Sequence, residues 1–372
     1  MAPVYRALER VPGIDPSLLV TGQHQEQLDQ ALSTFGLTVT ANLRVMTARQ
    51  RLPELVQRIL PEAARHLREM RATYVLVQGD TLSTFAIAWA AFLERIPVGH
   101  VEAGLRSYDA SEPFPEEANR CLTAVVADLH FAPTNLAREN LLREGKKSES
   151  ISVTGQTGVD ALLFAAGRGT LPDELPPGPY VTITLHRREN WPRLAELAGV
   201  MRRAAHRHPD VTFVYPVHLN PVVREAVWPV LADVENVFLL DPLEYSSMVA
   251  LMEASRLIIT DSGGLQEEGT TLGVPVMIVR NVTERPEGIE GGTLRLVGTD
   301  SEGLLEAISV ALTAEAESIG RIPLSMNPYG DGHASERVAG AVAWRLGLGS
   351  RPADWDGPEL AETVEPRSRL HV

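Results

Sequence analysis

The amino-acid sequence predicts an α/β fold with two doubly wound domains, each built around a parallel sheet. Three observations lead to this prediction. Short apolar runs of strand length alternate with segments of helical periodicity, which is the pattern of βαβ units. The chain has 372 residues, a length that favours two domains over one. Between its halves lies Gly167–Pro179, which is rich in glycine and proline and lacks periodicity, as is typical of a hinge.

Composition narrows the class of protein. Hydrophobic residues make up 44% of the chain, enough for a sizeable core. The 48 acidic and 34 basic residues give a formal net charge of -14, so nucleic acid is not an expected partner, because phosphate binding needs a basic face. One cysteine, Cys121, allows neither an internal disulfide nor a multi-cysteine zinc site. No apolar run is long enough to span a bilayer and the segment MAPVYRALER lacks a signal core, so we expect a cytoplasmic protein without a membrane partner.

The N-terminal domain is expected to span residues 1–166 and to open on a helix. Helical periodicity covers Pro3–Arg10, Gln25–Leu32 and Pro53–Met70, and Leu18–Thr21 has the length and composition of a strand. A doubly wound domain normally opens on a strand. We therefore expect the natural protein to begin upstream of Met1, with a strand and a loop containing glycine and arginine.

The central βαβ unit of this domain is the part around which the rest is organised. Tyr74–Val77 and Pro97–Val101 are apolar and of strand length, and the helical segment Ser83–Glu94 lies between them. Both strands are followed directly by polar residues. Ligands of open parallel sheets bind just beyond the carboxyl ends of the strands, so this edge is the predicted site.

The remaining elements follow by the same reasoning. The first domain continues with a helix, a strand, a helix and a strand at Glu116–Ala127, Leu129–Ala132, Leu136–Glu144 and Ile151–Thr154. The second domain, residues 180–326, has six predicted strands: Tyr180–Leu185, Thr212–Val217, Val237–Leu240, Leu257–Thr260, Val276–Val279 and Leu294–Val297. A last helix is predicted at Asn327–Leu346, followed by a polar, loosely held tail over residues 350–372.

Three carboxylates, Asp80, Glu102 and Glu116, are expected together at the predicted site. Each has an ordinary structural explanation: a helix cap for Asp80, an ion pair with Arg106 for Glu102, and an ion pair with Arg120 for Glu116. Their placement on adjacent strand ends favours a shared role. Paired acids of this type transfer protons once burial raises one pKa.

The run Asp261-Ser262-Gly263-Gly264 follows a predicted strand and precedes a predicted helix. Glycines let a ligand approach the backbone, and a helix N-terminus offers free N–H groups and partial positive charge, so this run is a predicted diphosphate cradle. The alternative is an ordinary capped helix start. Glu267 and Glu268 lie one turn later, where one of them can reach a ribose diol; the alternative for each is a solvated helix acid.

A cationic cluster, His186-Arg187-Arg188-Glu189, follows the first strand of the second domain and indicates an anion site. The alternative is a solvated strand end in which an arginine pairs with Glu189. His218 follows the next strand in the same way; taken alone, it is more typical of a capping or packing histidine. The sequence has no G-x-G-x-x-G fingerprint after a strand, no Walker loop and no HExxH motif, so we expect neither a redox cofactor nor a metal.

Seven stretches carry a resemblance to a known family: HVEAGLRS, PFPEEANR, VTGQTGVDAL, HRREN, YPVHLNP, TDSGGLQEE and NVTERPEG. Together and in this order they resemble the motifs of the non-hydrolysing UDP-N-acetylglucosamine 2-epimerases. The resemblance covers the chain from about Val4 to Gly349. It implies two Rossmann-like domains arranged as in the B-type glycosyltransferases, with the helix at 327–346 returning to the first domain.

The resemblance also implies an activity and a set of site residues. The activity is interconversion of UDP-GlcNAc and UDP-ManNAc by a cytoplasmic homodimer that needs no cofactor and supplies ManNAc for cell-surface polysaccharide. The implied catalytic residues are Asp80, Glu102, Glu116 and His186. The implied UDP-binding residues are Ser262, Gly263, Gly264, Glu268 and Arg285. An allosteric UDP-GlcNAc site is implied at Gln23, His24, Arg187 and His218. Family members begin with a strand and a Gly-Thr-Arg-Pro-Glu loop that have no counterpart here.

The chemistry of such a reaction agrees with the residues. The C2 proton of an acetamido sugar is not acidic, so elimination of UDP to a glycal, followed by re-addition, offers a route that needs a base, an acid and a held diphosphate. Three other functions stay open: a retaining glycosyltransferase, a hydrolysing epimerase and a nucleotide-sugar sensor without turnover.

Overall fold

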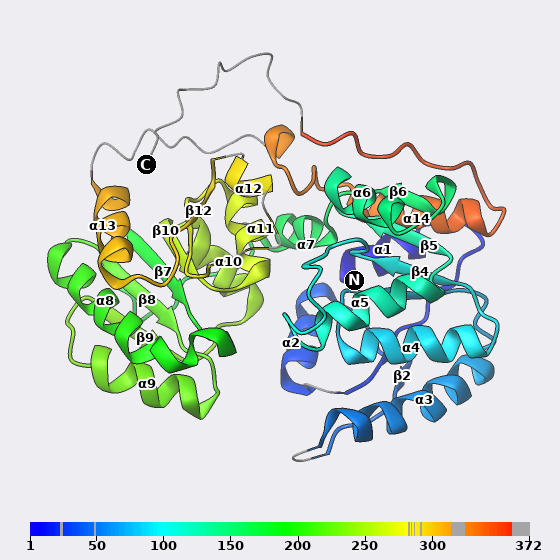
Figure 1. Ribbon diagram of the computed structural model, residues 1–372, viewed down its shortest axis with the longest axis horizontal. Helices are drawn as coiled ribbons and strands as arrows, with labels where there is room; N and C mark the ends of the chain where they lie inside the picture. The colour runs from blue at the N-terminus through cyan, green and yellow to red at the C-terminus, as the bar shows by residue number, and fades with distance from the viewer. Residues whose placement is uncertain are drawn as a thin grey trace.

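The computed structural model describes residues 1–358 except 23, 24, 48, 49, 282, 284, 286, 291 and 314–323. Each half of the chain forms a parallel sheet flanked by helices (Figure 1). The N-terminal half lies to the right in that view and the C-terminal half to the left. The predicted α/β fold class is therefore confirmed. Within the described part of the chain, no helix has both the length and the apolar character needed to cross a bilayer.

The N-terminal sheet has the parallel strand order β3-β4-β5-β6. Its strands are Val75–Gln78 (β3), Val98–Val101 (β4), Leu129–Ala132 (β5) and Ile151–Val153 (β6). A separate parallel pair, β1 (Leu19–Val20) and β2 (Ala41–Asn42), precedes them in the chain. The sequence analysis predicted every one of these strands except β2, whose two residues carry no apolar run.

Helices cover both faces of this sheet because alternate strand residues point to opposite sides. Val75 and Val77 pack with α3 (Leu52–Glu69) and α4 (Leu82–Leu93). Val101 and Phe131 pack on the other face with α1 (Ala2–Glu9) and α14 (Ala334–Arg345). The remaining helices of this half are α2 (Gln25–Phe35), α5 (Glu116–Val126), α6 (Asn135–Arg143), α7 (Thr157–Ala165) and the 3-10 turn η1 (Ser148–Ser150).

The C-terminal sheet is also fully parallel, with the order β12-β11-β10-β7-β8-β9. Its strands are Tyr180–Thr184 (β7), Thr212–Pro216 (β8), Val237–Leu240 (β9), Ser255–Thr260 (β10), Val276–Ile278 (β11) and Leu294–Leu296 (β12). One face packs against α8 (Leu194–Arg207), α9 (Pro221–Leu231) and α13 (Ser301–Leu312). The other packs against α10 (Tyr245–Glu253) and α11 (Gly263–Leu272). Shorter helical pieces are η2 (Arg188–Arg193), α12 (Glu287–Glu290) and η4 (Leu324–Met326).

Helix α7 lies between the two sheets in Figure 1. The sequence analysis did not predict it. Its Val159 and Leu162 are fully buried in one cluster with Val249, Ile258 and Val276 of the second half. Helix α7, which follows the last strand of the first sheet, thus packs into the core beside the second sheet, so the two halves share apolar surface.

The predicted last helix, Asn327–Leu346, is wrong in its first third. Residues 327–333 are not helical, and α14 starts only at Ala334. Gly330 (φ 152°) and Gly332 (φ 85°) have backbone conformations that interrupt a helix. A turn begins here at Asn327, because its side-chain Oδ1 accepts the N–H of the buried Tyr329 (3.0 Å).

The prediction of a loose tail from Ser350 is wrong for residues 351–357. Trp355 is 7% exposed, and its N–H donates to the Val153 carbonyl of β6 (2.7 Å). The Val153 N–H donates to Asp354 Oδ1 (3.2 Å), and Arg351 Nη2 donates to the Ile151 carbonyl (2.6 Å). This segment therefore covers the open edge of the N-terminal sheet. Residues 359–372 lie outside the described part.

Candidate active site

Asp80 stands just beyond the carboxyl end of β3. Gly79, with φ 74°, turns the chain after the strand, and the Asp80 carboxylate forms an ion pair with Arg120 of α5. The alternative in which Asp80 caps the next helix is wrong. Thr81 is the N-cap of α4, and its hydroxyl accepts the Thr84 N–H (3.2 Å). Asp80 is thus held by an arginine and not used by the helix.

Glu102 follows β4 and has a left-handed backbone conformation, φ 67°. This conformation costs free energy for a residue with a Cβ, and residues that adopt it cluster at functional sites. The Glu102 Oε2 lies 3.5 Å from Gln78 Nε2. The pKa of Glu102 is raised to about 7, mainly by burial and also by Glu267 and Asp80, while Arg285 and the Gln78 hydrogen bond oppose the shift. The alternative ion pair with Arg106 is wrong, because the Arg106 Nε pairs with Glu144 (2.6 Å).

Glu116 is the first residue of α5, one turn before Arg120 on the same helix face. The alternative in which these two residues form an ion pair is wrong. Arg120 instead contacts Asp80 and the buried Glu117 (3.2 Å). Glu117 also accepts the backbone N–H groups of Ser107 and Tyr108 (both 3.1 Å) and so fixes the loop after β4. Helix α5 therefore brings both Glu116 and Arg120 to the edge that carries Asp80.

In the second half, the fully buried Asp261 organises the loop that carries His186. Asp261 accepts the backbone N–H of His186 (3.0 Å), the N–H of Arg187 (3.0 Å) and the side-chain amide of Asn190 (3.0 Å). Asp261 follows β10 and the loop follows β7, so a carboxylate on one strand end sets the backbone of its neighbour. Asp261 is therefore not a helix cap; Ser262 holds the N-cap position of α11.

His186 and His218 lie face to face, with ring centroids 5.5 Å apart and 14° between their planes. Burial lowers the pKa of His186 in the main; Asp261 opposes this shift, while His218 and Arg187 add to it. The alternative of a solvated strand end in which Arg187 or Arg188 pairs with Glu189 is wrong, because Glu189 pairs with Arg280 (2.6 Å). Gln23 and His24 lie outside the described residues.

The N-terminus of α11 meets Arg285. A Cβ on Gly263 would lie 2.7 Å from Arg285 Nη1, whereas one on Gly264 would meet nothing within 4 Å. The first glycine lies in close contact with the guanidinium, and the second leaves open space beside the helix N-terminus. Glu268, one turn on, accepts the Tyr245 hydroxyl (3.0 Å).

Arg285 joins the two halves of the protein. Its Nε donates to Glu267 Oε1 (2.5 Å), and its Nη2 lies 3.7 Å from Glu102 Oε1. Two further contacts cross between the halves: Gln156 Nε2 to Glu267 Oε1 (3.3 Å) and Thr134 Oγ1 to Glu287 Oε1 (2.8 Å). The strand ends of the two sheets thus face each other, with Arg285 between the Glu102 carboxylate and α11.

Sequence reasoning missed the partners of these groups. The sequence alone favours a helix cap for Asp261 and allows an ion pair between Arg120 and Glu116, and it does not indicate that Glu267 pairs with Arg285. Helical periodicity does indicate that Glu267 is buried. Residues 263, 266, 267 and 270 lie on one face of α11, and this face packs toward the sheet. The contact between Glu102 and Arg285 joins residues 183 positions apart, and neither neighbourhood indicates it.

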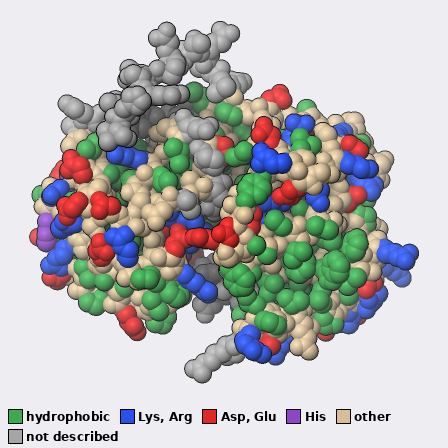
Figure 2. Space-filling view, viewed as in Figure 1, with side chains coloured by type: hydrophobic (Ala, Val, Ile, Leu, Met, Phe, Trp, Pro, Cys, Tyr) green, Lys and Arg blue, Asp and Glu red, His purple; other side chains and the backbone are tan. Residues whose placement is uncertain are grey.

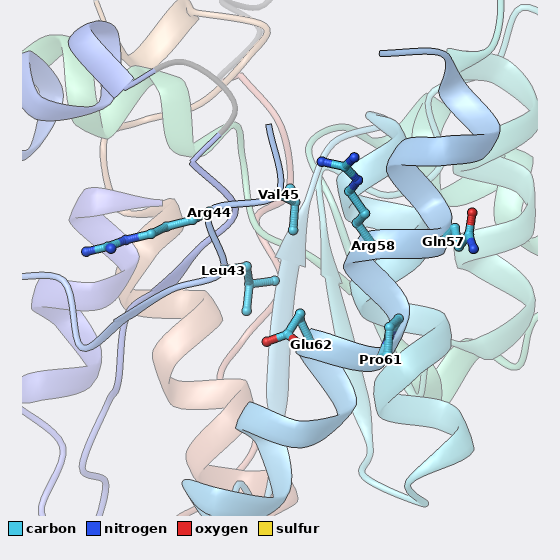
Figure 3. Close-up of a pocket in the computed structure, with 7 residues that line it drawn as sticks. All are labelled: Leu43, Arg44, Val45, Gln57, Arg58, Pro61 and Glu62. Atoms are coloured by element: carbon cyan, nitrogen blue, oxygen red, sulfur yellow. The ribbon is translucent and has the colours of Figure 1, made fainter. Parts of the chain in front are cut away.

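A separate pocket of about 490 Å³ lies between α3 and the segment after β2 (Figure 3). In that view Arg58 extends over the pocket toward Val45, while Arg44 points away from it. No candidate site residue lines it. The lining residues are Leu43, Arg44, Val45, Gln57, Arg58, Pro61 and Glu62.

Two parallel α/β domains whose strand ends face each other define a class of two-domain Rossmann-like proteins. A glycosyltransferase from Rickettsia africae, 13% identical to this chain with a TM-score of 0.56, shares this fold alone. The family model described as UDP-N-acetylglucosamine 2-epimerase matches residues 6–343. The chain therefore belongs to the UDP-N-acetylglucosamine 2-epimerase family, a family of isomerases, as the sequence motifs predicted.

Individual relatives agree with this assignment. A UDP-N-acetylglucosamine 2-epimerase of Escherichia coli is 44% identical over 355 residues, 92% of this chain and 94% of the relative. The solved structure of Staphylococcus aureus MnaA with UDP is 40% identical, covers 95% of both chains and has a TM-score of 0.87. The Neisseria meningitidis UDP-GlcNAc 2-epimerase bound to UDP-GlcNAc is 38% identical, covers 93% of this chain and 96% of its own, and has a TM-score of 0.87.

Proposed function

We propose that the protein interconverts UDP-GlcNAc and UDP-ManNAc without hydrolysing either. The observation that carries the proposal is the pair of carboxylates Asp80 and Glu102 on adjacent strand ends. Arg120, which lies 40 residues after Asp80 and 18 after Glu102 in the sequence, forms an ion pair with Asp80. Arg285 reaches Glu102 from the other domain. Family membership supports the substrate. Solved relatives hold UDP or UDP-GlcNAc.

The proposed reaction is an elimination followed by an addition. A carboxylate takes the C2 proton of the sugar while the C1–O bond to the diphosphate breaks, which gives a 2-acetamidoglycal and UDP. UDP then adds back to C1, and a second group returns a proton to the opposite face of C2. No net oxidation occurs. The buried Glu102, whose pKa is raised to about 7, can hold or release a proton near neutral pH, and the carboxylate of Asp80, ion-paired with Arg120, follows the adjacent strand. We assign Glu116 and His186 to the same catalytic group.

We place UDP at the N-terminus of α11. The open space beside Gly264 admits a diphosphate close to the N-terminus of α11, where the partial positive charge of the helix is greatest. Arg285 adds a full charge at the same position. Glu268, half-buried one turn later, is the acceptor that we assign to the ribose hydroxyls.

The rings of His186 and His218 suggest how a second nucleotide-sugar site would communicate with the first. We propose that UDP-GlcNAc also binds beside Arg187 and His218, as the family resemblance implies, with Gln23 and His24. A ligand there would contact the ring that stacks on His186 and the residue next to it. The product of the reaction is an activated amino sugar. We propose that the protein acts in the cytoplasm and that its product supplies ManNAc for cell-surface polysaccharide.

The reaction is tested by ³¹P NMR of UDP-GlcNAc incubated with the purified protein and no added cofactor. We expect the sugar-diphosphate signals to divide between UDP-GlcNAc and UDP-ManNAc, with free UDP staying at trace level. Stoichiometric release of UDP with free ManNAc would instead indicate the hydrolysing reaction. Unchanged UDP-GlcNAc, with binding detected by calorimetry, would leave a nucleotide-sugar sensor.

We also propose that the protein is a homodimer that pairs through helices α4 and α5. Phe85, Trp89 and Phe92 stack in a row along α4, with centroids 6.5 and 5.5 Å apart. Phe92 is 50% exposed, and Val125 of α5 is 70% exposed. Figure 2 shows hydrophobic side chains gathered on the part of this face where Figure 1 places α4 and α5. Contiguous apolar surface of this kind marks an interface.

The dimer is tested by sedimentation of the parent and of Val125→Asp. A buried unpaired carboxylate at the interface costs more than the contact gains, so we expect the parent to sediment as a dimer and the variant as a monomer. Val310→Asp, at a 52% exposed valine of α13 in the other domain, is the matched control and should stay dimeric. A parent that sediments as a monomer, or a Val125→Asp variant that stays dimeric, would contradict the assignment.

A further inference from the structure

Three successive backbone carbonyls, from Gln78 at the end of β3 to Asp80, are each held by a buried side chain from a different element. Thr84 Oγ1 of α4 donates to the carbonyl of Gln78 (2.7 Å). His100 Nε2 of β4 donates to the carbonyl of Gly79 (2.8 Å). Asn119 Nδ2 of α5 donates to the carbonyl of Asp80 (2.9 Å). We call these three donors the carbonyl clamp.

The clamp is built into the core and not into the solvent layer. Thr84 is 7% exposed, His100 0% and Asn119 4%. A loop after a strand usually turns its carbonyls to water, where they can reorient freely. Here three consecutive peptide planes have their orientation set by the packed elements beneath them. The Gly79 N–H is also paired, with the carbonyl of Val101 (3.0 Å), so the turn is fixed on both sides.

His100 shows that the clamp has a cost. Burial lowers its pKa to about 4, so the ring is neutral at neutral pH. Its Nδ1 has no hydrogen-bond partner among the described residues, which is unfavourable for a buried polar atom. An apolar side chain, such as those of Val98 and Val101 in the same strand, would avoid this penalty. The strand nevertheless has a histidine at position 100, and its hydrogen-bonded nitrogen, Nε2, reaches the Gly79 carbonyl.

We propose that Thr84, His100 and Asn119 are positioning residues that fix the Asp80 carboxylate for proton transfer. The inference rests on the proposed function, in which Asp80 acts at C2 of the sugar. Arg120 holds the carboxylate end of Asp80, and the clamp holds its backbone. Proton transfer demands that the reacting atoms be held close to their productive geometry, and a displacement of about 1 Å can cost about 10²-fold in rate.

The test compares variants that keep or lose each donor. His100→Gln places an amide nitrogen where the ring Nε2 lies, and His100→Leu has no donor. Thr84→Ser keeps the hydroxyl, and Thr84→Val replaces it with a methyl group. His130, paired with His100 across β4 and β5 and 2% exposed, provides the control variant His130→Leu, which removes a buried strand histidine outside the clamp.

We expect His100→Leu and Thr84→Val to lower kcat about 10–100-fold while KM for UDP-GlcNAc changes by less than about 2-fold, because orientation and not substrate binding is lost. His100→Gln and Thr84→Ser should restore kcat to within about 3-fold of the parent. His130→Leu should keep the parent kcat. Folded His100→Leu and Thr84→Val variants with the parent kcat, or an equal loss in His130→Leu, would overturn the proposal.

Hydrogen exchange separates this inference from the proposed function. Backbone amides of residues 79–82 should exchange faster in His100→Leu and Thr84→Val than in the parent, and at the parent rate in the two donor-keeping variants. A parent without epimerase turnover would refute the proposed function, and the exchange data would then decide the clamp alone. Equal exchange in all variants would show that the three donors do not hold the loop.

Discussion

Carboxylates of the same chemical type have different environments in this protein, and those environments separate their roles. Asp80 is ion-paired with Arg120. Glu117 is buried, and each of its carboxylate oxygens accepts a backbone N–H group. Glu102 and Glu268 are the acids whose pKa burial raises to about 7, one on each domain. An acid that holds its proton near neutral pH is suited to proton transfer or to hydrogen bonding with sugar hydroxyls.

Glu268 therefore makes folding depend on pH. Its pKa is raised from 4.5 to about 7, so its contribution to stability is complete below pH 4.5 and is lost as the pH rises through 7. Glu268→Gln keeps the acceptor for Tyr245 and never ionises. We expect the variant to gain about 1–3 kcal/mol in unfolding free energy relative to the parent between pH 4.5 and pH 8.

Chemical denaturation at a series of pH values measures this difference. Glu139→Gln, at an exposed acid of α6, is the control for a change of surface charge. A difference between parent and Glu268→Gln that is the same at pH 4.5 and pH 8 would contradict the raised pKa. UDP affinity should fall in Glu268→Gln if the residue binds ribose, so the variant should gain stability and lose affinity together.

At the scale of elements, helix α11 offers the clearest case of a sequence feature with two explanations. Gly263 is in close contact with the Arg285 guanidinium, whereas a Cβ on Gly264 would meet nothing within 4 Å. A glycine in a helix costs about 0.5–1 kcal/mol relative to alanine, so Gly264 is unfavourable for folding alone. Open space for a ligand is the function that we assign to it.

Gly264→Ala tests this assignment. We expect UDP affinity to fall about 10-fold or more, since a methyl group would occupy the space proposed for the diphosphate, while thermal stability is kept or increased. Gly199→Ala in α8, where an added Cβ also meets nothing within 4 Å, is the matched control. It should increase stability and leave UDP binding unchanged in calorimetry. Equal UDP affinity in both variants would remove the diphosphate from this helix terminus.

The sequence was sufficient for most elements, because apolar runs such as Tyr180–Thr184 and Leu129–Ala132 are buried on both faces of their sheets, as central parallel strands are. It was insufficient where tertiary contacts decide. Glycines 330 and 332 end the helical pattern before α14. The edge of β6 captures a tail whose composition resembles a loose segment.

At the scale of the whole molecule, the candidate site consists of two halves that the chain builds separately. Asp80 and Glu102 lie at the carboxyl ends of two strands of the N-terminal sheet, and α11 and Arg285 belong to the C-terminal half. The sequence could place each half, because polar residues follow apolar strands in both domains. It could not pair Arg285 with Glu102, or Asp261 with the loop of His186, because such contacts depend on how the sheets stack and not on local pattern.

The most direct test of the account is ¹H NMR of UDP-GlcNAc incubated with the protein in D₂O. If the carboxylates at this site exchange the C2 proton, the H2 signal of UDP-GlcNAc will disappear as UDP-ManNAc forms, and both sugars will carry deuterium at C2. Asp80→Asn should bind UDP but exchange C2 about 10²–10⁴-fold more slowly. Retention of the C2 proton in UDP-GlcNAc and in any UDP-ManNAc formed by the parent protein would contradict the account.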